Sequence, residues 1–370
     1  MKLEFDKKLG FGCMRFKDKS KFSYISNMFD KFIDAGYTYF DTARVYLEGT
    51  SEKIIKKCLT SRFDRDKYIL ADKLSSSCFK NEDEIDDLFL NQLKDTGVEY
   101  FDFYLMHAQE KSTYKKYMKT NAYSHALEFK KQGRIKHFGI SFHDTPAMLT
   151  KILNKWPQIE FVQIQLNYLD MYDNAINSAK LLKICKDYKK PVIVMEPTKG
   201  GSLTNLPDDY KSLIEKKGQT LANLAFRYAA NQKGVFMVLS GMNDINQVKE
   251  NIKTFNNLSL LDDDEITSVK NIVDKLNNAG QIKCTGCRYC VDGCPKHINI
   301  PEIFSCFNKK KMFNNWNQNF YYGVVHTSRG RRAKDCIKCG RCEKSCPQHL
   351  KIRHHLQQCS EIFDKDLGKH

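Results

Sequence analysis

The chain has 370 residues, of which 41% are hydrophobic, and its formal net charge at neutral pH is +16. A chain of this length buries a full-sized core and leaves room for a second, smaller domain. Its lysines and arginines are scattered, with only short runs such as Lys309–Lys311. We therefore expect a solvated basic surface and exclude a nucleic-acid-binding tract.

From the N-terminus to about residue 275, short apolar runs alternate with amphipathic helical stretches. The expected strands are Leu9–Cys13, Tyr39–Ala43, Tyr68–Ala71, Phe101–Met106, Ile135–Ile140, Phe161–Leu166, Val192–Met195 and Val235–Leu239. The helical stretches between them include Phe22–Ala35, Ser51–Leu59, Glu82–Leu93, Ala122–Gln132 and Thr220–Ala230. This alternation predicts an α/β fold, a closed (β/α)8 TIM barrel with its active site at the C-terminal ends of the strands. An open dinucleotide-binding sheet is disfavoured, because the turn after the first strand lacks the third glycine of that motif.

The barrel pattern ends with a helical stretch at Asp262–Asn278, and Ala279-Gly280 then marks a boundary. Beyond it, Ile300–Phe307 again has a helical pattern, and so has the beginning of the last segment at Ile352. The predicted division is a barrel at residues 1–278, a small, mostly helical module at residues 279–355 and a C-terminal tail at residues 356–370.

Four polar residues stand where expected strands end or just beyond them: Asp41, Tyr46, Lys73 and His107. Taken singly, each has an ordinary explanation, such as a structural ion pair or a buried histidine with satisfied hydrogen bonds. Together, at the end of the barrel that carries active sites, they indicate a catalytic site.

These residues lie in segments that resemble the aldo/keto reductase signature. The matching positions are Gly36–Ala43, Tyr46, Gly49, Ser51, Glu52, Asp102–His107, Gly139–Ser141 and Gln163. The positions resembling the family's adenosine-phosphate end are Gly241, Gln247, Glu250 and Asn251. The resemblance covers about residues 5–275, and it implies a barrel that reduces or oxidises a small carbonyl compound with NADP(H).

The chemistry of carbonyl reduction agrees with the roles that the resemblance implies. The reaction needs a hydride on carbon and a proton on oxygen, and a free tyrosine, with a pKa near 10, is a weak acid. We expect Lys73 to lower the pKa of Tyr46, the proposed proton donor, while Asp41 keeps Lys73 charged. His107 would donate to the substrate oxygen as negative charge develops there.

The nicotinamide end departs from the family pattern. By resemblance, Ser141 and Gln163 bind the carboxamide, but Phe142 stands where an asparagine usually follows the serine. The aromatic residue on which the nicotinamide usually stacks falls near Met195. The resemblance still makes NADP(H) the expected cofactor. Because of these departures, a flavin such as FMN, alone or exchangeable with NADP(H), is the alternative.

The adenosine end lacks a cation in sequence. No lysine or arginine stands between Gly241 and Gln247 to bind a 2′-phosphate. Asn243, Lys199 and Lys249 are the candidates that the sequence offers instead.

Eight of the 14 cysteines form two copies of the pattern C-x2-C-x2-C-x3-C-P. The copies are Cys284, Cys287, Cys290 and Cys294, and Cys336, Cys339, Cys342 and Cys346. Each cysteine of the second copy lies 52 residues after its counterpart, which indicates an internal duplication. The pattern resembles the ligand run of bacterial ferredoxins with two [4Fe–4S] clusters, in which the fourth cysteine of each run ligates the other cluster. Zinc is the alternative, although zinc ribbons usually present separated C-x2-C pairs.

The fusion resembles the ferredoxin-fused branch of the aldo/keto reductases, and it raises a question of electron counting. Each cluster transfers one electron, whereas a hydride carries two, so a converter such as a flavin is needed unless the clusters act separately or are structural. With two clusters bound the net charge is about +12. That charge would attract an acidic electron carrier, a ferredoxin or a flavodoxin.

The sequence does not define the substrate. We expect Glu110–Asn121 and the segment after Pro197 to form pocket loops, with Tyr114, Tyr117 and Tyr123 either as aromatic pocket surface or in a solvated loop. The rival interpretation of the whole chain is an electron-transfer or redox-sensing module with a barrel that binds cofactor without turnover.

The predicted location is the cytoplasm of an anaerobic cell. Met1–Lys8 is charged and predicts no export signal, and no apolar run approaches membrane-spanning length. Cluster thiolates together with six further cysteines indicate a reducing compartment.

Overall fold

The computed structural model describes residues 5–173, 176–214, 219–277, 282–284, 286–313, 317–327 and 330–365. Its contacts divide the chain into two units, here called the barrel unit and the C-terminal unit. The barrel unit contains Met1–Met171, Ile176–Lys199 and Gln219–Asp262. The C-terminal unit contains Tyr172–Ala175, Gly200–Gly218 and Asp263–His370.

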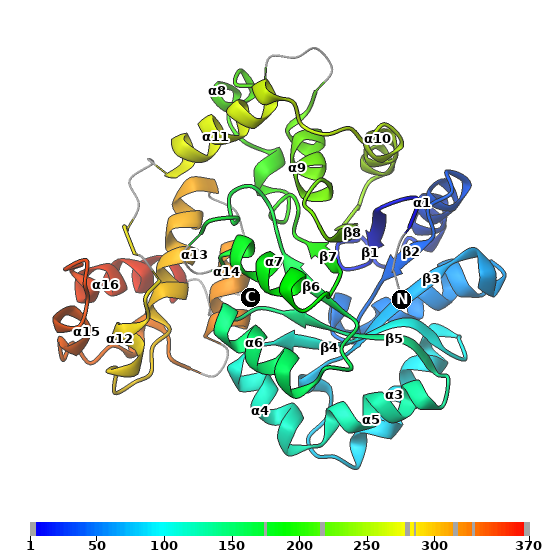
Figure 1. The fold of residues 1–370 in the computed structure, drawn as a ribbon, viewed down its shortest axis with the longest axis horizontal. Coiled ribbons are helices and arrows are strands. Elements are labelled where there is room, and N and C mark those ends of the chain that lie inside the picture. Colours follow the sequence, from blue (N-terminus) through cyan, green and yellow to red (C-terminus); the bar gives the residue numbers. More distant parts are fainter. Residues whose placement is uncertain are drawn as a thin grey trace. The chain divides into compact units, whose positions relative to one another are not determined.

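Eight parallel strands close the barrel in sequence order, and β1 pairs with both β2 and β8 (Figure 1). The strands are β1 (Leu9–Gly12), β2 (Tyr39–Asp41), β3 (Ile69–Leu74), β4 (Phe101–Gln109), β5 (Ile135–Phe142), β6 (Phe161–Gln165), β7 (Val192–Met195) and β8 (Val235–Ser240). The predicted α/β barrel is confirmed, and each expected strand overlaps an observed one. The largest differences are in β3 and β4, which continue three residues beyond the apolar runs and therefore include Lys73 and His107.

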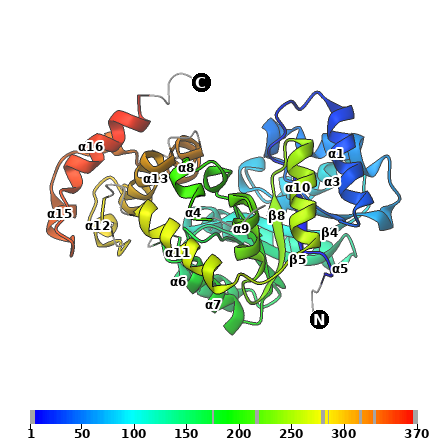
Figure 2. The same cartoon turned by 90° about the horizontal axis from the view of Figure 1, so that it is seen from above.

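Helices surround the barrel on its outer face, and α1 lies beside α10 (Figure 2). They are α1 (Phe22–Asp34), α2 (Ser51–Ile55), α3 (Glu84–Thr96), α4 (Lys111–Lys119), α5 (Ala122–Lys131), α6 (Pro146–Lys155), α7 (Ser178–Asp187), α9 (Leu221–Ala230) and α10 (Ile245–Asn256). A π-helical stretch, Lys56–Thr60, continues α2. In α1 the buried residues Ile25, Met28, Phe29 and Phe32 recur at helical spacing, so one face packs on the strands.

Aromatic side chains fill the inside of the barrel below the strand ends. The buried set is Tyr39, Ala71, Phe103, Leu105, Phe161, Ile193, Phe236, Met237 and Leu239. Phe5 packs against this set, with its ring stacked on Phe236 at 5.8 Å between centroids. Gly139 on β5 leaves the room that the Phe161 ring takes, because a Cβ there would lie 2.5 Å from that ring.

The segment Glu110–Asn121 is not a pocket loop. It forms α4, and Tyr117 and Tyr123 are fully buried while Tyr114 is 7% exposed. The hydroxyl of Tyr117 donates to the carbonyls of Leu74 and His107, so this ring braces the ends of β3 and β4. The prediction of aromatic pocket surface or of a solvated loop is therefore wrong, because the tyrosines pack inward.

The C-terminal unit is mostly helical, as predicted. Its helices are α8 (Asp208–Lys211), α11 (Asp263–Asn277), α12 (Tyr289–Asp292), α13 (Ile300–Phe313), α14 (Asn317–Phe320), α15 (Arg341–Lys344) and α16 (Ile352–Phe363). Three helical stretches of other types accompany them: the 3₁₀ turns η5 (Ser202–Thr204) and η7 (Ala333–Asp335), and the π-helical Tyr321–His326. The core of this unit lies between α13 and α16, where Ile303, Phe304, Leu356 and Phe363 are buried.

Two segments that follow barrel strands belong to the C-terminal unit. Asp173, after β6, lies 3.5 Å from Lys309 of α13. Gly200, after β7, accepts a hydrogen bond of 2.9 Å from Asn317 of α14. In α8, Asp209 pairs with Lys275 of α11 at 2.5 Å. The boundary predicted at residues 278–279 lies outside the described residues and stays a prediction.

Among the described residues, no helix is both long enough and apolar enough to cross a membrane.

Candidate active site and cysteine module

The four expected catalytic side chains meet at the C-terminal ends of β2, β3 and β4. Asp41 is the last residue of β2, Lys73 is the last but one of β3, and His107 lies near the end of β4. Tyr46 begins the turn after β2, where Leu47 and Glu48 have positive φ angles of 52° and 57°. Such left-handed backbone costs energy in residues other than glycine, and it clusters at functional sites.

Lys73 is a fully buried cation with two oxygen partners. Its Nζ lies 2.6 Å from Oδ1 of Asp41 and donates to the carbonyl of Thr42 at 2.6 Å. Burial alone would lower the pKa of Lys73, but the negative charge of Asp41, with smaller effects of the hydrogen bonds to Asp41 and Tyr46, outweighs it and raises the pKa above its ordinary value. Lys73 is therefore charged at neutral pH, as expected from the sequence.

The ring of Tyr46 lies next to this ion pair. The Nζ of Lys73 is 4.7 Å from the centroid of the Tyr46 ring, and the ring meets that of His107 edge-on at 5.9 Å. Burial raises the pKa of Tyr46 above 10, while the nearby Lys73 lowers it. The expected effect of Lys73 is therefore present, but the larger effect of burial leaves the pKa of Tyr46 above its ordinary value. The phenol is thus protonated at neutral pH, with the charge of Lys73 placed to stabilise loss of the proton.

His107 is neutral at neutral pH. Burial, with a smaller effect of the Lys73 charge, lowers its pKa well below 6.5. Its Nδ1 lies 2.6 Å from Oγ of Ser75. If Nδ1 accepts from that hydroxyl, the ring proton is on Nε2, from which it can donate to an oxygen of a substrate.

A second carboxyl pair, Glu52 and Asp72, lies behind Lys73, and both side chains are fully buried. Oδ1 of Asp72 accepts from the amide of Lys73 at 2.7 Å. Gln92 bridges the pair to the active-site strand, because its Nε2 donates to Oε1 of Glu52 at 3.0 Å and to the carbonyl of Lys73 at 3.1 Å. Arg44 lies 3.0 Å from the other oxygen of Glu52.

Burial raises the pKa of Glu52 to about 7, and burial together with the negative charge of Glu52 raises the pKa of Asp72 well above 3.8. Two like charges this close cannot both ionise without cost, so the pair retains a proton at neutral pH. The sequence interpretation missed this pair. A signal in the sequence was Asp72, which directly follows the apolar run and lies next to Lys73, on the opposite side of the strand.

Ser141 and Gln163, the residues expected at the nicotinamide end, lie side by side, because they are register partners in β5 and β6. Oγ of Ser141 accepts from the amide of Ala108 at 2.7 Å. Nε2 of Gln163 is 3.7 Å from the sulfur of Met195, whereas its buried Oε1 has no partner among the described residues. A buried acceptor without a partner fits the amide group of a nicotinamide, although Phe142 is buried and offers only its ring.

The residues expected at the adenosine end lie between the end of β8 and α10. The backbone amide of Asn243 donates to the side-chain oxygen of Gln247 at 3.0 Å. The side-chain oxygen Oδ1 of Asn243 is buried without a partner among the described residues. Asn251 donates to Ser240 at 3.0 Å, and Glu250 accepts from Thr220 at 2.7 Å. These last two are therefore already engaged in contacts within the protein.

Arg15, from the loop after β1, is a cation near the expected adenosine end that the sequence interpretation did not consider. Its side chain covers Gly241, since a Cβ on that glycine would lie 2.7 Å from Cγ of Arg15. In contrast, Lys199 is buried in an ion pair with Asp170 at 2.6 Å and is not available for a phosphate. Lys249 is exposed on α10.

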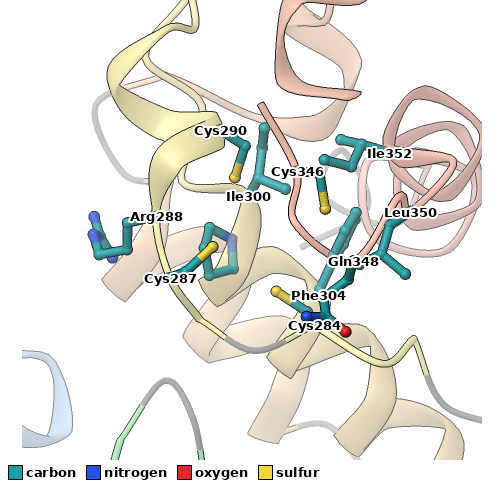
Figure 3. Close-up of a pocket in the computed structure, with 11 residues that line it drawn as sticks. Cys284, Cys287, Arg288, Cys290, Ile300, Phe304, Cys346, Gln348, Leu350 and Ile352 are labelled. Carbon is teal, nitrogen blue, oxygen red and sulfur yellow. The ribbon is translucent and has the colours of Figure 1, made fainter. Parts of the chain in front are cut away.

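The eight motif cysteines gather around two cavities in the C-terminal unit. The first cavity is lined by Cys284, Cys287, Cys290 and Cys346, whose sulfur atoms turn toward a common space (Figure 3). The second is lined by Cys294, Cys336, Cys339 and Cys342. The grouping is the crossed one expected from the ferredoxin pattern, in which each run gives its fourth cysteine to the other site.

The cavities fit two clusters by their donor set of four thiols each and by their apolar walls. Ile300 lines both cavities. Burial raises the pKa of Cys290 to about 12, and a bound metal would have to displace that proton. The described residues contain no group of three or more His, Cys, Asp or Glu side chains placed around a single ion.

Comparisons with known proteins agree with both parts of the chain. The model of the aldo/keto reductase family matches residues 8–274, and that of a 4Fe-4S dicluster domain matches residues 283–351. A comparison with curated proteins found no match.

The barrel resembles solved aldo/keto reductase structures. One, from Klebsiella pneumoniae in complex with NADPH, is 18% identical, with 72% of this chain and 90% of that chain covered and a TM-score of 0.58. The holo form of one from Bacillus halodurans is 23% identical, with 75% and 95% covered and a TM-score of 0.58. One from Brucella melitensis is 22% identical, with 72% and 93% covered and a TM-score of 0.56. At these identities the likeness shows the fold alone.

The carboxyl pair leads to a prediction about pH and stability. The raised pKa of Glu52 means that the folded chain keeps a proton that the unfolded chain loses, so stability should fall as pH rises from about 4.5 to about 7. Glu52→Gln removes this titration. Circular dichroism melting between about pH 5 and pH 7 should then show a smaller decrease in melting temperature than in the wild type. Glu99→Gln, at an exposed position, is the control and should keep the wild-type slope; equal slopes in all three proteins would contradict the prediction.

The cysteine grouping leads to a prediction about metal content. Protein purified without oxygen should contain about eight iron atoms and eight sulfides per chain. Because ligation is crossed, Cys346→Ser should remove a ligand from the first site, which otherwise holds cysteines of the first run. It should also disturb the segment of the second run, in which Cys346 itself lies. Cys78→Ser, in the barrel, should leave the iron content unchanged. Stoichiometric zinc with little iron would refute the assignment.

Proposed function

The chain belongs to the aldo/keto reductase family and carries a 4Fe-4S dicluster domain, and from this premise we propose a specific activity for it. It is an oxidoreductase of small carbonyl compounds whose barrel binds NADP(H), and its two clusters relay single electrons to or from an acidic carrier protein, with a flavin as the converter where those electrons enter the two-electron reaction. The observation that carries the catalytic part is the Tyr46 ring over the buried ion pair of Lys73 and Asp41, beside a neutral His107.

The four side chains suit proton transfer to a carbonyl oxygen. Tyr46 is protonated at rest, and the ammonium of Lys73 stabilises the phenolate that forms when the proton leaves. His107, which is neutral, donates to the same oxygen through Nε2. In the oxidative direction the same groups accept the proton.

NADP(H), when bound, supplies or accepts the hydride. The buried acceptor oxygens of Gln163 and Asn243 support binding of this cofactor at its two ends. Arg15 beside Gly241 supports recognition of a 2′-phosphate, because a guanidinium pairs with phosphate through a planar fork of donors.

A flavin is the second candidate, and the nicotinamide end favours it. Met195 is in the place of the usual stacking aromatic, and Phe142 replaces the amide-bearing neighbour of Ser141. Reduction of a carbonyl takes two electrons and two protons, and two clusters hold one electron each. A flavin at this position would join the one-electron and two-electron steps.

We call Asp41, Tyr46, Lys73 and His107 the tetrad, and the prediction for it concerns Tyr46. Tyr46→Phe removes the proton donor and should lower the rate of carbonyl turnover by about 10²–10⁴-fold. Lys73→Met should lower it at least as much, because the phenol then loses its charged partner. NADPH binding, followed by fluorescence titration, should remain close to the wild type in Tyr46→Phe. Tyr114→Phe, in a buried tyrosine outside the tetrad, is the control, and unchanged turnover in both active-site variants would show that catalysis lies elsewhere.

The prediction for the clusters concerns the full chain, reduced with dithionite and freed of excess reductant. Mixing it with a panel of small aldehydes and ketones, with and without NADP⁺, should reoxidise the clusters, as followed by their visible absorption. Extraction of the bound organic cofactor separates the nicotinamide from the flavin form. Tyr46→Phe should slow the reoxidation in parallel with its turnover. If cluster absorption stays constant while the carbonyl is reduced by NADPH, the clusters are not in the electron path.

A further inference from the structure

The internal duplication provides a matched comparison of the two cysteine sites. Four positions around the second site carry a cation where the equivalent position around the first does not. The pairs, second site first, are Lys296 and Gln348, Lys338 and Gly286, Arg341 and Tyr289, and Lys344 and Asp292. The two sites share their cysteine pattern, so their difference in charge is a difference in the surroundings of the clusters.

The four cations of the second site, here called the cationic rim, are Lys296, Lys338, Arg341 and Lys344, and all are exposed. Within the described part of the chain none of them forms an ion pair. The nearby acid Glu343 is already neutralised by Arg353 at 2.8 Å. Around the first site, by comparison, Arg288 pairs with Glu302, and Lys283 donates to the carbonyl of Asn277 at 3.2 Å.

An apolar residue lies among these cations. Ile337 is 56% exposed and lines the second cavity, between Cys336 and the exposed Cys339. Interfaces between proteins commonly surround an apolar centre with a polar rim, and charges in the rim steer association. Cys287 of the first site is exposed as well, and Tyr289 beside it is 61% exposed. The charge therefore distinguishes the two sites, rather than access to a cysteine or an exposed apolar side chain.

We propose that the cationic rim and Ile337 form the docking surface for an acidic electron-transfer protein, which exchanges one electron at a time with the second cluster. This inference rests on the proposed function, in which the clusters carry electrons. The carrier is oxidised by one electron and the second cluster is reduced by one, without a proton. With both clusters bound, the first cluster would receive the electron from the second, its neighbour on the other side of the shared lining residue Ile300.

The test exchanges rim residues for their duplicated counterparts. The variant Lys296→Gln/Arg341→Tyr/Lys344→Asp uses residues that the first site already holds in the same loop positions. The probe is a reduced acidic bacterial ferredoxin, mixed with the oxidised full chain in a stopped-flow instrument at low ionic strength. The rate constant for loss of cluster absorption should fall at least about tenfold, and its dependence on salt should weaken.

A matched control changes the same net charge on the barrel unit. Lys53→Gln/Lys67→Tyr/Lys131→Asp, at exposed positions, should reduce at nearly the wild-type rate. Lys344→Asp alone should slow the reaction several-fold, which keeps the test valid if the triple variant loses clusters. The extent of bleaching by excess dithionite reports cluster content in every variant.

A wild-type rate in the rim variants, or an equal decrease in the barrel control, would overturn the docking surface. Cluster bleaching is read directly and not through substrate turnover. A failure of the proposed carbonyl activity is therefore distinguishable from a failure of this inference.

Discussion

Lys73 can remain charged inside the barrel only because oxygens of Asp41 and Thr42 lie 2.6 Å from its ammonium group. A buried cation without such partners would be neutralised at a cost of several kcal/mol. The parallel register supplies them, since it places the ends of β2 and β3 next to each other. Tyr46, the neutral His107 and the second carboxyl pair all lie around this one charge.

The charge of Lys73 also explains why the site can hold a protonated phenol and a neutral imidazole together. Burial favours the uncharged form of both groups, and the cation adds to that effect for His107 while it opposes it for Tyr46. The proton held by Glu52 and Asp72 limits the negative charge behind Lys73. Without that proton, Glu52 and Asp72 would both be carboxylates near the single ammonium group of Lys73, in addition to Asp41.

Much of this was readable from the sequence, because it depends on local patterns. The apolar runs located the strands, the polar residues at their ends located the tetrad, and the spacing of the cysteines gave the crossed grouping. What escaped prediction depends on distance or depth. Arg15 and Gly241 meet only because β1 closes the barrel against β8, and no local pattern shows how far Tyr114, Tyr117 or the Tyr46 ring is buried. The roles of the site residues remain predictions from their placement.

The chain passes between its two units five times, after Met171, Ala175, Lys199, Gly218 and Asp262. The cluster-bearing part is therefore not an appendage that one cut would release. A chain ending near residue 278 would leave Asp173 and Gly200 without Lys309 and Asn317, their partners in α13 and α14. Grafting the cysteine segment onto another barrel would likewise fail to transfer the strand-following loops on which its helices pack. The loops after β6 and β7 and the helices that pack on them therefore form one structural unit, although they are far apart in the sequence.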